Sequence, residues 1–438
     1  MSREPITSVK GTRDILPEES AAWQRVEQAA RTLFDRYGYR EIRPPVIEET
    51  QLFARSIGAE TDIVAKEMYT FDDRDGSSIT LRPEATAGIV RAVVEHNLVN
   101  TDPALKVWTL GPMFRRERPQ KGRYRQFHQV DVEAFGLAHW AMDVEIIDMA
   151  LAYLRACGIT GCELVLNSVG DAQCRPQYVE TLREALRPQA ARMCTDCQRR
   201  AETNPLRVLD CKVPEDQPLI DALPRISDHL CPECRSHFDG VKEGLKLLEI
   251  PYRLSHRLVR GLDYYTRTTF EVTSDALGAQ NSVLGGGRYD GLVKELGGPD
   301  LPAVGFALGL ERLVMMLGEQ PALPRCDLFL VLAVKQNQPA SSAGVEFDRR
   351  PTDEALERAM RMQHLLRGRG VRVLMDPGGG SIKSQMKRAD RLGARFVAIL
   401  GEAEMDRGTW TVRDMARSFQ EPVAEEEVAA YLEDRLRG

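Results

Sequence analysis

The pattern of apolar and polar positions predicts that the first half of the chain mixes helices with short strands. Apolar side chains recur at helical spacing between residues 20 and 39, where Gly38 supplies a stop signal. The extended segment that follows is interrupted by Pro44 and Pro45. Further along, the pattern predicts a strand, a basic loop and a second strand over 105–136, a helix over 140–157 and a strand over 165–169.

The middle of the chain, residues 172–248, has a different character. Cysteines cluster there, charges multiply and strand patterns disappear, until a strand-like run resumes at Tyr252. We therefore expect a mostly helical insertion domain over 172–248. Residues 1–171 and 249–322 are expected to form one domain that this insertion interrupts.

The pattern in the last part of the chain predicts a small α/β domain over residues 326–438. A Pro-rich joint at 321–324 follows a helical pattern at 309–318, and strands then alternate with helices, which predicts a largely parallel sheet. Residues 336–352 carry no pattern and are interpreted as a mobile loop. The expected elements are a strand at 328–334, a helix at 353–368, a strand at 371–374, a helix at 382–392 and a strand at 396–400.

The most informative segment covers residues 114–133. Its first half carries six cations against the single anion Glu117, with Pro119 and Gly122 as loop residues. Its second half alternates with a period of two, which is typical of a strand. One face of this strand would carry Phe127, Gln129, Asp131, Glu133 and Phe135.

Such an acidic face beside a cationic loop predicts a binding cleft. Buried carboxylates are costly unless they are paired, so the face is expected to line a wet cleft. The neighbouring cations suit a polyphosphate or a nucleic acid. The alternative is a solvated hairpin with a charged tip.

Charge and cysteine content restrict the class of protein. The net charge of −6 excludes a generally basic nucleic-acid coat, so any contact with nucleic acid must come from local patches. The first 20 residues contain four acidic side chains and no apolar run, which is unlike a signal peptide, and no run approaches membrane-spanning length. We expect a cytoplasmic protein whose nine cysteines are mostly reduced.

Familiar nucleotide and metalloenzyme motifs are absent. The chain has no GxxxxGK[ST] sequence and no His-Glu dipeptide, which argues against a P-loop fold and excludes an HExxH zinc hydrolase. If the chain binds ATP, arginines must hold the phosphates, because guanidinium groups pair bidentately with phosphate oxygens. Taken singly, an arginine is more often part of a surface ion pair, but four of them in Gly- or aromatic-flanked settings favour the binding role. The candidates are Arg115, Arg123, Arg260 and Arg312.

Three further motifs have more than one interpretation. The polar turn 82–86 is either a simple helix start or a place where Glu84 and Thr86 accept a ligand ammonium group. The glycine run at 285–291 is either a connector or a backbone that a ligand approaches closely. In a regular strand Tyr264 and Tyr265 would point to opposite faces, and the sequence leaves their orientation open.

These motifs resemble those of the histidyl-tRNA synthetase family, which are class II aminoacyl-tRNA synthetases. Residues 111–129 resemble the second class II motif in its histidine-specific form, and 309–312 resemble the third. Residues 258–265 and 285–290 resemble the two histidine-specific signatures. The helix and strand ending at Pro45 resemble the first motif, which builds the dimer interface in this family. The resemblance runs from about residue 11 to about residue 402.

The resemblance implies a fold and a reaction. The fold would be α+β: a class II catalytic core with an antiparallel sheet and helices, an inserted helical domain, and a C-terminal α/β anticodon-binding domain. The reaction would be activation of L-histidine by ATP to histidyl-adenylate and pyrophosphate, followed by transfer of histidine to tRNA(His). ATP would be a substrate, Mg²⁺ would accompany its outer phosphates, and the enzyme would be a homodimer.

The resemblance also implies residue roles. Glu84 and Thr86 would hold the α-amino group of histidine. Glu133 and Tyr265 would read the imidazole, with Gln129 and Tyr264 completing the pocket. Arg115 and Arg260 would contact the α-phosphate as the catalytic pair. The remaining ATP contacts would come from Glu117, Arg123, Phe127 and Arg312.

Contacts with tRNA are expected from two regions. In the basic loop the candidates are Arg118, Gln120 and Lys121, and the insertion would clamp the acceptor arm. In the C-terminal domain, Lys383, Lys387 and Arg391 fall on one helical face, which is otherwise an ordinary solvated face. The anticodon-contact candidates there are Gln385, Lys387 and Arg388.

The insertion contains a zinc-type pattern that the family does not as a rule share. Two CxxC pairs, Cys194 with Cys197 and Cys231 with Cys234, predict one structural Zn²⁺ on four thiolates. Cys211 would be a spare thiol and His237 an alternate ligand. The competing interpretations are a labile disulfide or plain buried thiols.

Other classes of protein fit the sequence less well. The main alternative is the non-catalytic, synthetase-like regulatory subunit of ATP phosphoribosyltransferase, which lacks the C-terminal domain and usually has degraded histidine signatures. This chain keeps Arg260, Tyr264 and Tyr265. A stress-sensing kinase regulator would need a kinase domain, for which the length leaves no room. A prolyl or threonyl class II enzyme disagrees with the tyrosine pair and with Glu133.

Overall fold

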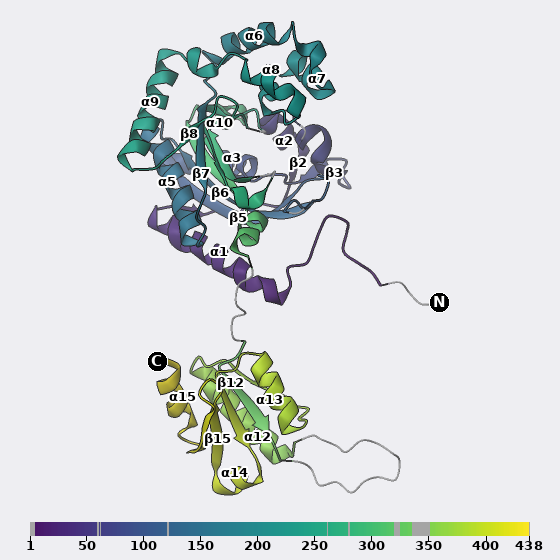
Figure 1. Cartoon of the computed structure of the whole chain (residues 1–438), viewed down its shortest axis with the longest axis vertical. Helices are drawn as coiled ribbons and strands as arrows, with labels where there is room; N and C mark the ends of the chain where they lie inside the picture. Colours follow the sequence, from purple (N-terminus) through teal and green to yellow (C-terminus); the bar gives the residue numbers. More distant parts are fainter. Residues whose placement is uncertain are drawn as a thin grey trace. The chain divides into compact units, whose positions relative to one another are not determined.

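The chain forms two compact units, residues 1–320 and 321–438 (Figure 1). The structure is a computed structural model that describes residues 5–58, 61, 63–120, 122–260, 262–278, 281–318, 325–334 and 351–437. Most of the segment 336–352, interpreted from the sequence as a loop, lies outside these residues. Among the described helices none is long and apolar enough to cross a membrane.

The first unit is built on two sheets. Its strands are β1 Arg40–Glu41, β2 Ile47–Glu49, β3 Tyr69–Asp72, β4 Ser78–Leu81, β5 Lys106–Phe114, β6 Gln126–Phe135, β7 Glu163–Ser168, β8 Arg253–Leu254, β9 Thr266–Thr273, β10 Ser282–Arg288 and β11 Ala303–Gly309. The large sheet has the order β1-β5-β6-β11-β10-β9-β7-β8, and β2-β4-β3 form the small one. The six central strands of the large sheet pair antiparallel, and β1 and β8 pair parallel to their neighbours at its two edges.

Helices cover one face of the large sheet. The helices of this unit outside the insertion are α1 Pro17–Arg36, α2 Thr50–Ile57, α3 Thr86–Glu95, α4 Leu98–Thr101, α5 Trp140–Ala156, α10 Leu292–Glu295 and α11 Leu310–Leu317. The buried stripe of α1 includes Trp23, Val26 and Phe34, at the helical spacing that the sequence shows. It shares a core with Val130 and Val132 of β6 and with parts of α5 and α11. The even-numbered face of β6 therefore packs inward, which leaves the odd-numbered face for the site.

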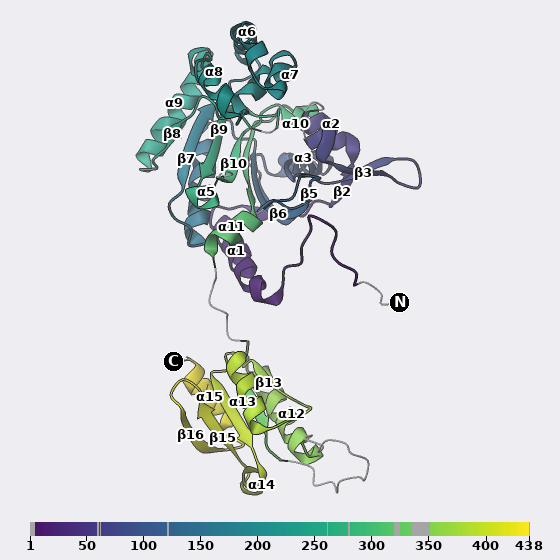
Figure 2. The same cartoon turned by 45° about the vertical axis from the view of Figure 1, so that its right-hand side comes forward.

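The insertion is helical, as predicted. It contains α6 Arg175–Leu186, α7 Thr195–Thr203, α8 Gln217–Asp221 and α9 Pro232–Leu247, with short 3₁₀ turns between them and no strand over 172–248. Figure 2 shows α6, α7 and α8 gathered beyond one end of the large sheet. The helix α9 instead packs on α5, where an added Cβ at Gly240 would lie 2.5 Å from the Trp140 ring.

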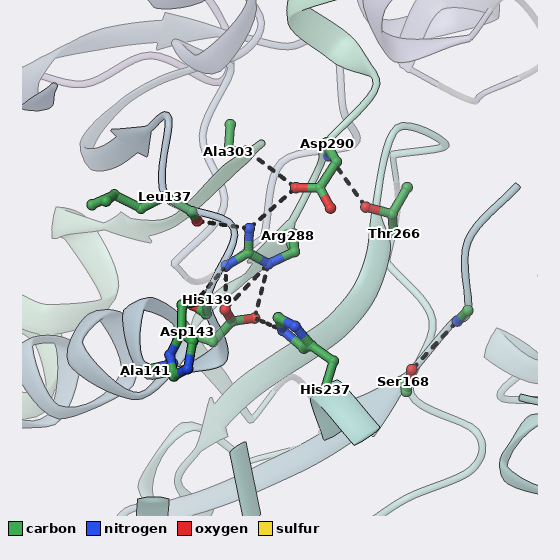
Figure 3. Close-up of polar contacts among 11 residues, drawn as sticks. Leu137, His139, Ala141, Asp143, Ser168, His237, Thr266, Arg288, Asp290 and Ala303 are labelled. Carbon is green, nitrogen blue, oxygen red and sulfur yellow. Dashed lines mark hydrogen bonds and ion pairs between the residues drawn. The ribbon is translucent and has the colours of Figure 1, made fainter. Parts of the chain in front are cut away.

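A buried ion pair joins β10 to both α5 and α9 (Figure 3). Arg288 is fully buried and its Nε lies 3.2 Å from Asp143 Oδ2, while His237 Nε2 lies 3.2 Å from Asp143 Oδ1. Arg288 Nη1 also donates to Asp290 Oδ1 at 3.2 Å and to the Leu137 carbonyl at 3.1 Å. Burial alone would raise the pKa of Asp143, but the charge of Arg288 and the contact with His237 lower it below its usual value. The Arg288 of the glycine-rich motif is thus a structural residue.

The second unit is an α/β domain. Its elements are β12 Leu328–Leu332, α12 Asp353–Gly368, β13 Val373–Met375, α13 Ile382–Arg391, β14 Phe396–Leu400, α14 Glu402–Arg407, β15 Thr409–Asp414, β16 Phe419–Ala424 and α15 Val428–Arg437. The strand order is β13-β12-β14-β15-β16. The first three strands are parallel, which confirms the expected alternation, whereas β15 and β16 add an antiparallel hairpin that the sequence analysis did not identify.

We expect the substitution Arg288→Met to destabilise the first unit strongly. It would leave the Asp143 carboxylate buried without its main counter-charge, which typically costs about 3–5 kcal/mol. The shift of the unfolding transition, measured by differential scanning calorimetry, checks this. The matched control is Lys294→Met in the exposed pair with Asp300, which should cost less than about 1 kcal/mol. Equal shifts for the two variants would contradict the structural role of Arg288.

Candidate active site

A single large cavity lies on the odd-numbered face of β6. Its volume is about 810 Å³, and it is lined by the central strands of the large sheet, by the start of α3, by the basic loop after β5 and by part of the insertion. Phe127, Gln129, Asp131 and Glu133 all line it, which confirms that the alternating acidic face borders a cleft. The solvated-hairpin interpretation is wrong for this strand, because Asp131 and Glu133 are at most 2% exposed.

One end of the cavity is acidic. Glu84 lies just before α3, and its two oxygens accept the backbone N–H groups of Thr86 at 2.8 Å and Ala87 at 2.9 Å. Thr86 Oγ1 donates to Glu133 Oε1 at 2.6 Å, and the Tyr289 hydroxyl donates to Glu133 Oε2 at 2.5 Å. The two interpretations of the turn 82–86 are therefore compatible, since Glu84 caps a helix and also lines the cavity.

These carboxyl groups lie where charge is costly. Burial raises the pKa of Asp131 to about 8 and the pKa of Glu133 to about 8, and it also raises the pKa of Glu84. Neither oxygen of Asp131 has a hydrogen-bond partner among the described residues, nor does Oε1 of the neighbouring Gln129. A ligand that brings a cation or several N–H donors would satisfy these atoms.

Both tyrosines of the 258–265 motif face this end of the cavity. They precede β9, which begins at Thr266, so the alternation of a regular strand does not apply to them. Tyr264 and Tyr265 are both nearly buried, their ring centroids lie 4.8 Å apart, and both line the cavity. The structure thus settles an orientation that the sequence left open.

Arginines and an aromatic ring form the other end. The guanidinium of Arg115 lies 5.2 Å from the centre of the Phe127 ring, and its Nε donates to the Pro83 carbonyl at 2.8 Å. Arg123 Nη1 donates to Glu117 Oε2 at 3.0 Å, within the hairpin that joins β5 to β6. A flat ring beside fixed guanidinium groups suits a base and its phosphates.

Two further arginines come from distant parts of the sequence. Arg260 Nη1 donates to Glu271 Oε2 of β9 at 2.6 Å, and a Cβ added at Gly285 would lie 2.3 Å from this guanidinium. Arg312 lies in the first turn of α11 directly after β11, as predicted, and donates to the Ser282 carbonyl. The glycine at 285 is thus required for a close approach to Arg260.

The structure changes the list of tRNA-contact candidates. Arg118 and Gln120 are exposed, and Lys121 lies outside the described residues. Lys387 and Arg388 are exposed on α13, the latter paired with Asp376 at 2.6 Å. Gln385 is only 1% exposed and bonds both backbone groups of Leu332, so its prediction as an anticodon contact was wrong.

The four CxxC cysteines do not share one site. Cys194 and Cys197 group with Cys211 and Asp216, whereas Cys231 and Cys234 group with Cys174 and Asp171. Cys211 is therefore not a spare thiol. His237, considered as an alternate ligand, is occupied by Asp143. The prediction of a single four-thiolate ion was wrong because two pairs that are regular in sequence meet different partners in space.

Sequence reasoning missed two residues of the cavity and gave a third no role. The alternation along the strand placed Asp131 on the cleft face beside Gln129 and Glu133 but assigned it no contact. Tyr289, in the glycine-rich motif, contacts Glu133 across the sheet, and Glu271 holds Arg260. No local signal in the sequence marks the last two, because their partners are more than ten residues away.

Comparisons with known proteins agree with this geometry. A family model described as histidyl-tRNA synthetase matches residues 11–313, and one described as anticodon binding domain matches 329–435. The histidine–tRNA ligase of Solibacter usitatus is 51% identical over 98% of this chain and 99% of its own length, and that of Syntrophotalea carbinolica is 48% identical over 99% of both. The crystal structure of the apo histidyl-tRNA synthetase of S. aureus matches with a TM-score of 0.79 and 36% identity, covering 98% of this chain and 100% of the other.

The antiparallel sheet, its arginine-lined cavity and the separate α/β unit define a class II aminoacyl-tRNA synthetase. Within that class, the matches over nearly the whole chain are specific. The chain belongs to the histidyl-tRNA synthetase family.

The buried Asp131 leads to a pH-dependent prediction for the protein without ligand. The pKa of the Asp131 carboxyl is about 8 in the folded protein, against 3.8 ordinarily. At a pH between these two values the carboxyl is protonated in the folded protein and ionised in the unfolded chain. The free energy of unfolding therefore falls as the pH rises from about 4 to 8. We expect Asp131→Asn, which cannot ionise, to gain thermal stability over the parent chain at pH 8 but much less at pH 5.

Melting temperatures at pH 5 and pH 8, taken without histidine, check this prediction. The exposed substitution Asp300→Asn serves as the control and should show no such difference. A stability difference for Asp131→Asn that is the same at both pH values would contradict it.

Proposed function

We propose that this chain is a histidine–tRNA ligase. It joins L-histidine to ATP, which gives histidyl-adenylate and pyrophosphate, and then transfers the histidyl group to the 3′ end of tRNA(His). The observation that carries the proposal is one cavity lined both by a cluster of buried carboxyl groups and by a set of arginines. Histidine brings an ammonium group and imidazole N–H groups to the first, and ATP brings phosphates to the second.

Histidine is held at the acidic end. Glu84 and Thr86 bind its α-amino group. Each oxygen of the Glu84 carboxylate accepts one backbone N–H at the start of α3, and its remaining lone pair can accept a hydrogen bond from the ammonium group. Glu133 and Tyr265 read the imidazole, and Gln129 and Tyr264 complete the pocket. An amino acid whose side chain lacks ring N–H groups would leave buried acceptors of the pocket unpaired. Sites of this kind discriminate against such analogues by a factor of roughly 10⁴–10⁵ in kcat/KM.

The arginine end carries out the activation. A carboxylate oxygen of histidine attacks the α-phosphorus of ATP, the bond from that phosphorus to the bridging oxygen breaks, and pyrophosphate leaves. Arg115 and Arg260 hold the α-phosphate oxygens on which charge develops. Phe127 stacks on the adenine, Arg123 and Arg312 hold the outer phosphates, and Glu117 orients Arg123. The nucleophile belongs to the substrate, so no side-chain nucleophile is needed.

Mg²⁺ fits the same part of the cavity. In nucleotide sites it is held by phosphates together with one or two carboxylates. Glu117 and Glu271 line the cavity beside the arginines and supply such oxygens. When bound, Mg²⁺ would neutralise charge on the pyrophosphate leaving group.

Transfer to tRNA is supported by exposed polar and cationic side chains in two regions and by family membership. The basic loop lies at the cavity, and its Arg118 and Gln120 contact the acceptor end. On α13, Lys387 and Arg388 contact the anticodon. Lys121 is retained as a candidate outside the described residues. The homodimer built on α1 and β1 and the cytoplasmic location stay predictions.

The decisive experiment is ATP–pyrophosphate exchange with histidine and with each other amino acid. We expect exchange with histidine alone, and we expect Arg260→Ala to lower its rate about 10²–10³-fold, the usual loss for one transition-state donor. Arg260→Lys should restore only part of the exchange rate, because an ammonium group cannot reproduce the two parallel hydrogen bonds of a guanidinium group. The control Arg361→Ala changes a side chain that is 81% exposed in the other unit.

The other outcomes separate the rival functions. Histidine binding without any exchange would support the regulatory-subunit reading. Exchange with a different amino acid would mean that class II chemistry stands while the assignment of the specificity residues fails.

The substitution Glu133→Gln tests the pocket itself. It keeps an acceptor oxygen for only one of the two hydroxyl groups, Thr86 or Tyr289, and it removes the carboxylate that faces the imidazole. Hydrogen bonds to charged groups contribute about 1.5–3 kcal/mol, so we expect the KM for histidine to rise about 10–150-fold while the KM for ATP changes little. Equal effects on both KM values would show that the residue supports the fold of the cavity and not recognition of the ring.

A further inference from the structure

The insertion contains two clusters of side chains whose donor atoms are arranged as metal ligands. In each cluster three cysteine sulfurs and one aspartate oxygen all lie within 4.8 Å of one another. The first cluster consists of Cys194, Cys197, Cys211 and Asp216. The second consists of Asp171, Cys174, Cys231 and Cys234.

The first cluster joins three consecutive segments of the insertion. Cys194 precedes α7, Cys197 lies in its first turn, and Cys211 follows the 3₁₀ turn Pro205–Asp210. Cys194 Sγ and Cys211 Sγ are 3.9 Å apart, and Cys211 Sγ lies 3.4 Å from Asp216 Oδ2. The backbone N–H of Val213 points to Cys211 Sγ at 3.4 Å.

The second cluster closes the insertion at its base. Asp171 and Cys174 lie where the chain enters α6, and Cys231 and Cys234 lie where it enters α9, so residues 60 positions apart meet here. Cys174 Sγ lies 3.6 Å and Cys231 Sγ 4.0 Å from Asp171 Oδ1. The Cys234 backbone N–H points to Cys231 Sγ at 3.5 Å. Three helices of nine or more residues thus begin at cysteines of the two clusters, and their N-termini favour negative charge.

The spacing of these atoms fits a tetrahedral ion better than a disulfide. Ligands about 2.3 Å from a central Zn²⁺ lie about 3.8 Å from one another, close to the measured 3.9 Å between Cys194 and Cys211. A disulfide needs a separation of about 2.05 Å. Thiolates with one carboxylate or imidazole are ligands that Zn²⁺ accepts, and hard ions such as Mg²⁺ do not prefer sulfur.

We propose that the insertion binds two structural Zn²⁺ ions, one in each cluster. Each ion takes three thiolates and one carboxylate, and each cysteine gives up its thiol proton on binding. Part of the negative charge that remains on the second site is offset by Arg267, whose Nη2 lies 3.6 Å from Asp171 Oδ2. The insertion has a small core of its own, to which several cysteines contribute. A small core supplies little stability, so bound ions would add stability that the packing of the insertion lacks.

Both sites lie next to walls of the cavity. Directly after Cys174, Arg175 donates to the carbonyl oxygens of Val169 at 3.1 Å, Gly170 at 3.2 Å and Tyr265. At the first site the Cys211 carbonyl accepts from Arg257 Nη2 at 3.1 Å, and Cys211 itself lines the cavity. The ions would therefore fix backbone that carries the histidine pocket as well as the insertion.

The test is the metal content of the whole chain, purified untagged and without added zinc. We expect two Zn²⁺ per chain after dialysis against a weak chelator, falling to one in Cys197→Ser and one in Cys234→Ser. The matched control is Cys162→Ser, a half-buried cysteine that belongs to neither cluster. One ion or none in the parent chain, or zinc that the weak chelator removes, would overturn the proposal.

A second measurement uses the unaltered chain, in case the serine variants fail to fold. The zinc is exchanged for Co²⁺, and the ultraviolet charge-transfer band and the visible d–d bands are recorded. Two tetrahedral, thiolate-rich sites per chain are expected. Six rapidly titrating thiols without Co²⁺ bands would overturn the proposal, as would mass-spectrometric evidence of disulfides within the clusters. Neither readout depends on catalysis, so this proposal and the proposed function can fail separately.

Discussion

The structure of the active site depends on the burial of three carboxyl groups at one place in the cavity. Glu84, Asp131 and Glu133 lie together at one end of the cavity, and burial raises the pKa of each. The protein satisfies part of their hydrogen-bonding capacity through the start of α3 and through Tyr289. The remainder, above all the unpartnered Asp131, makes the free site unfavourable until a donor-rich, cationic ligand arrives. Ligand binding at these carboxyl groups and the stability of the sheet are therefore linked.

Close approach of backbone and charged side chains is the second condition for this site. A Cβ at Gly305 would lie 1.8 Å from Glu133 Oε2, and one at Gly285 would lie 2.3 Å from Arg260. Adjacent strands β10 and β11 thus contribute bare backbone where β6 and the segment before β9 contribute charge. A side chain at either position would therefore have to displace Glu133 or Arg260.

Local periodicity predicted the elements that hold the site but not the long-range pairs within it. The alternation along β6 identified Gln129 and Glu133, and the strand-to-helix change at Gly309 placed Arg312 correctly. The orientation of the two tyrosines was not predictable, since it depends on where β9 begins. Gln385 was misjudged because helical spacing alone cannot distinguish a polar side chain that solvates the surface from one that satisfies a neighbouring strand. The cysteines were misassigned for a similar reason: CxxC spacing identifies a pair of ligands, but tertiary packing selects the other two.

Hydrogen bonds join the insertion to the wall of the cavity, which gives a physical route for communication between them. Arg175 begins α6 and at the same time donates to the carbonyl of Tyr265, so a shift of this helix changes the cavity wall that is proposed to read the imidazole. Arg257 similarly joins the Cys211 carbonyl to Asp221 of α8. Each guanidinium would lose several hydrogen bonds at once if its helix moved, so these contacts resist a shift of the insertion. A tRNA acceptor arm that selects one position of the insertion would therefore also select the geometry of the amino-acid pocket.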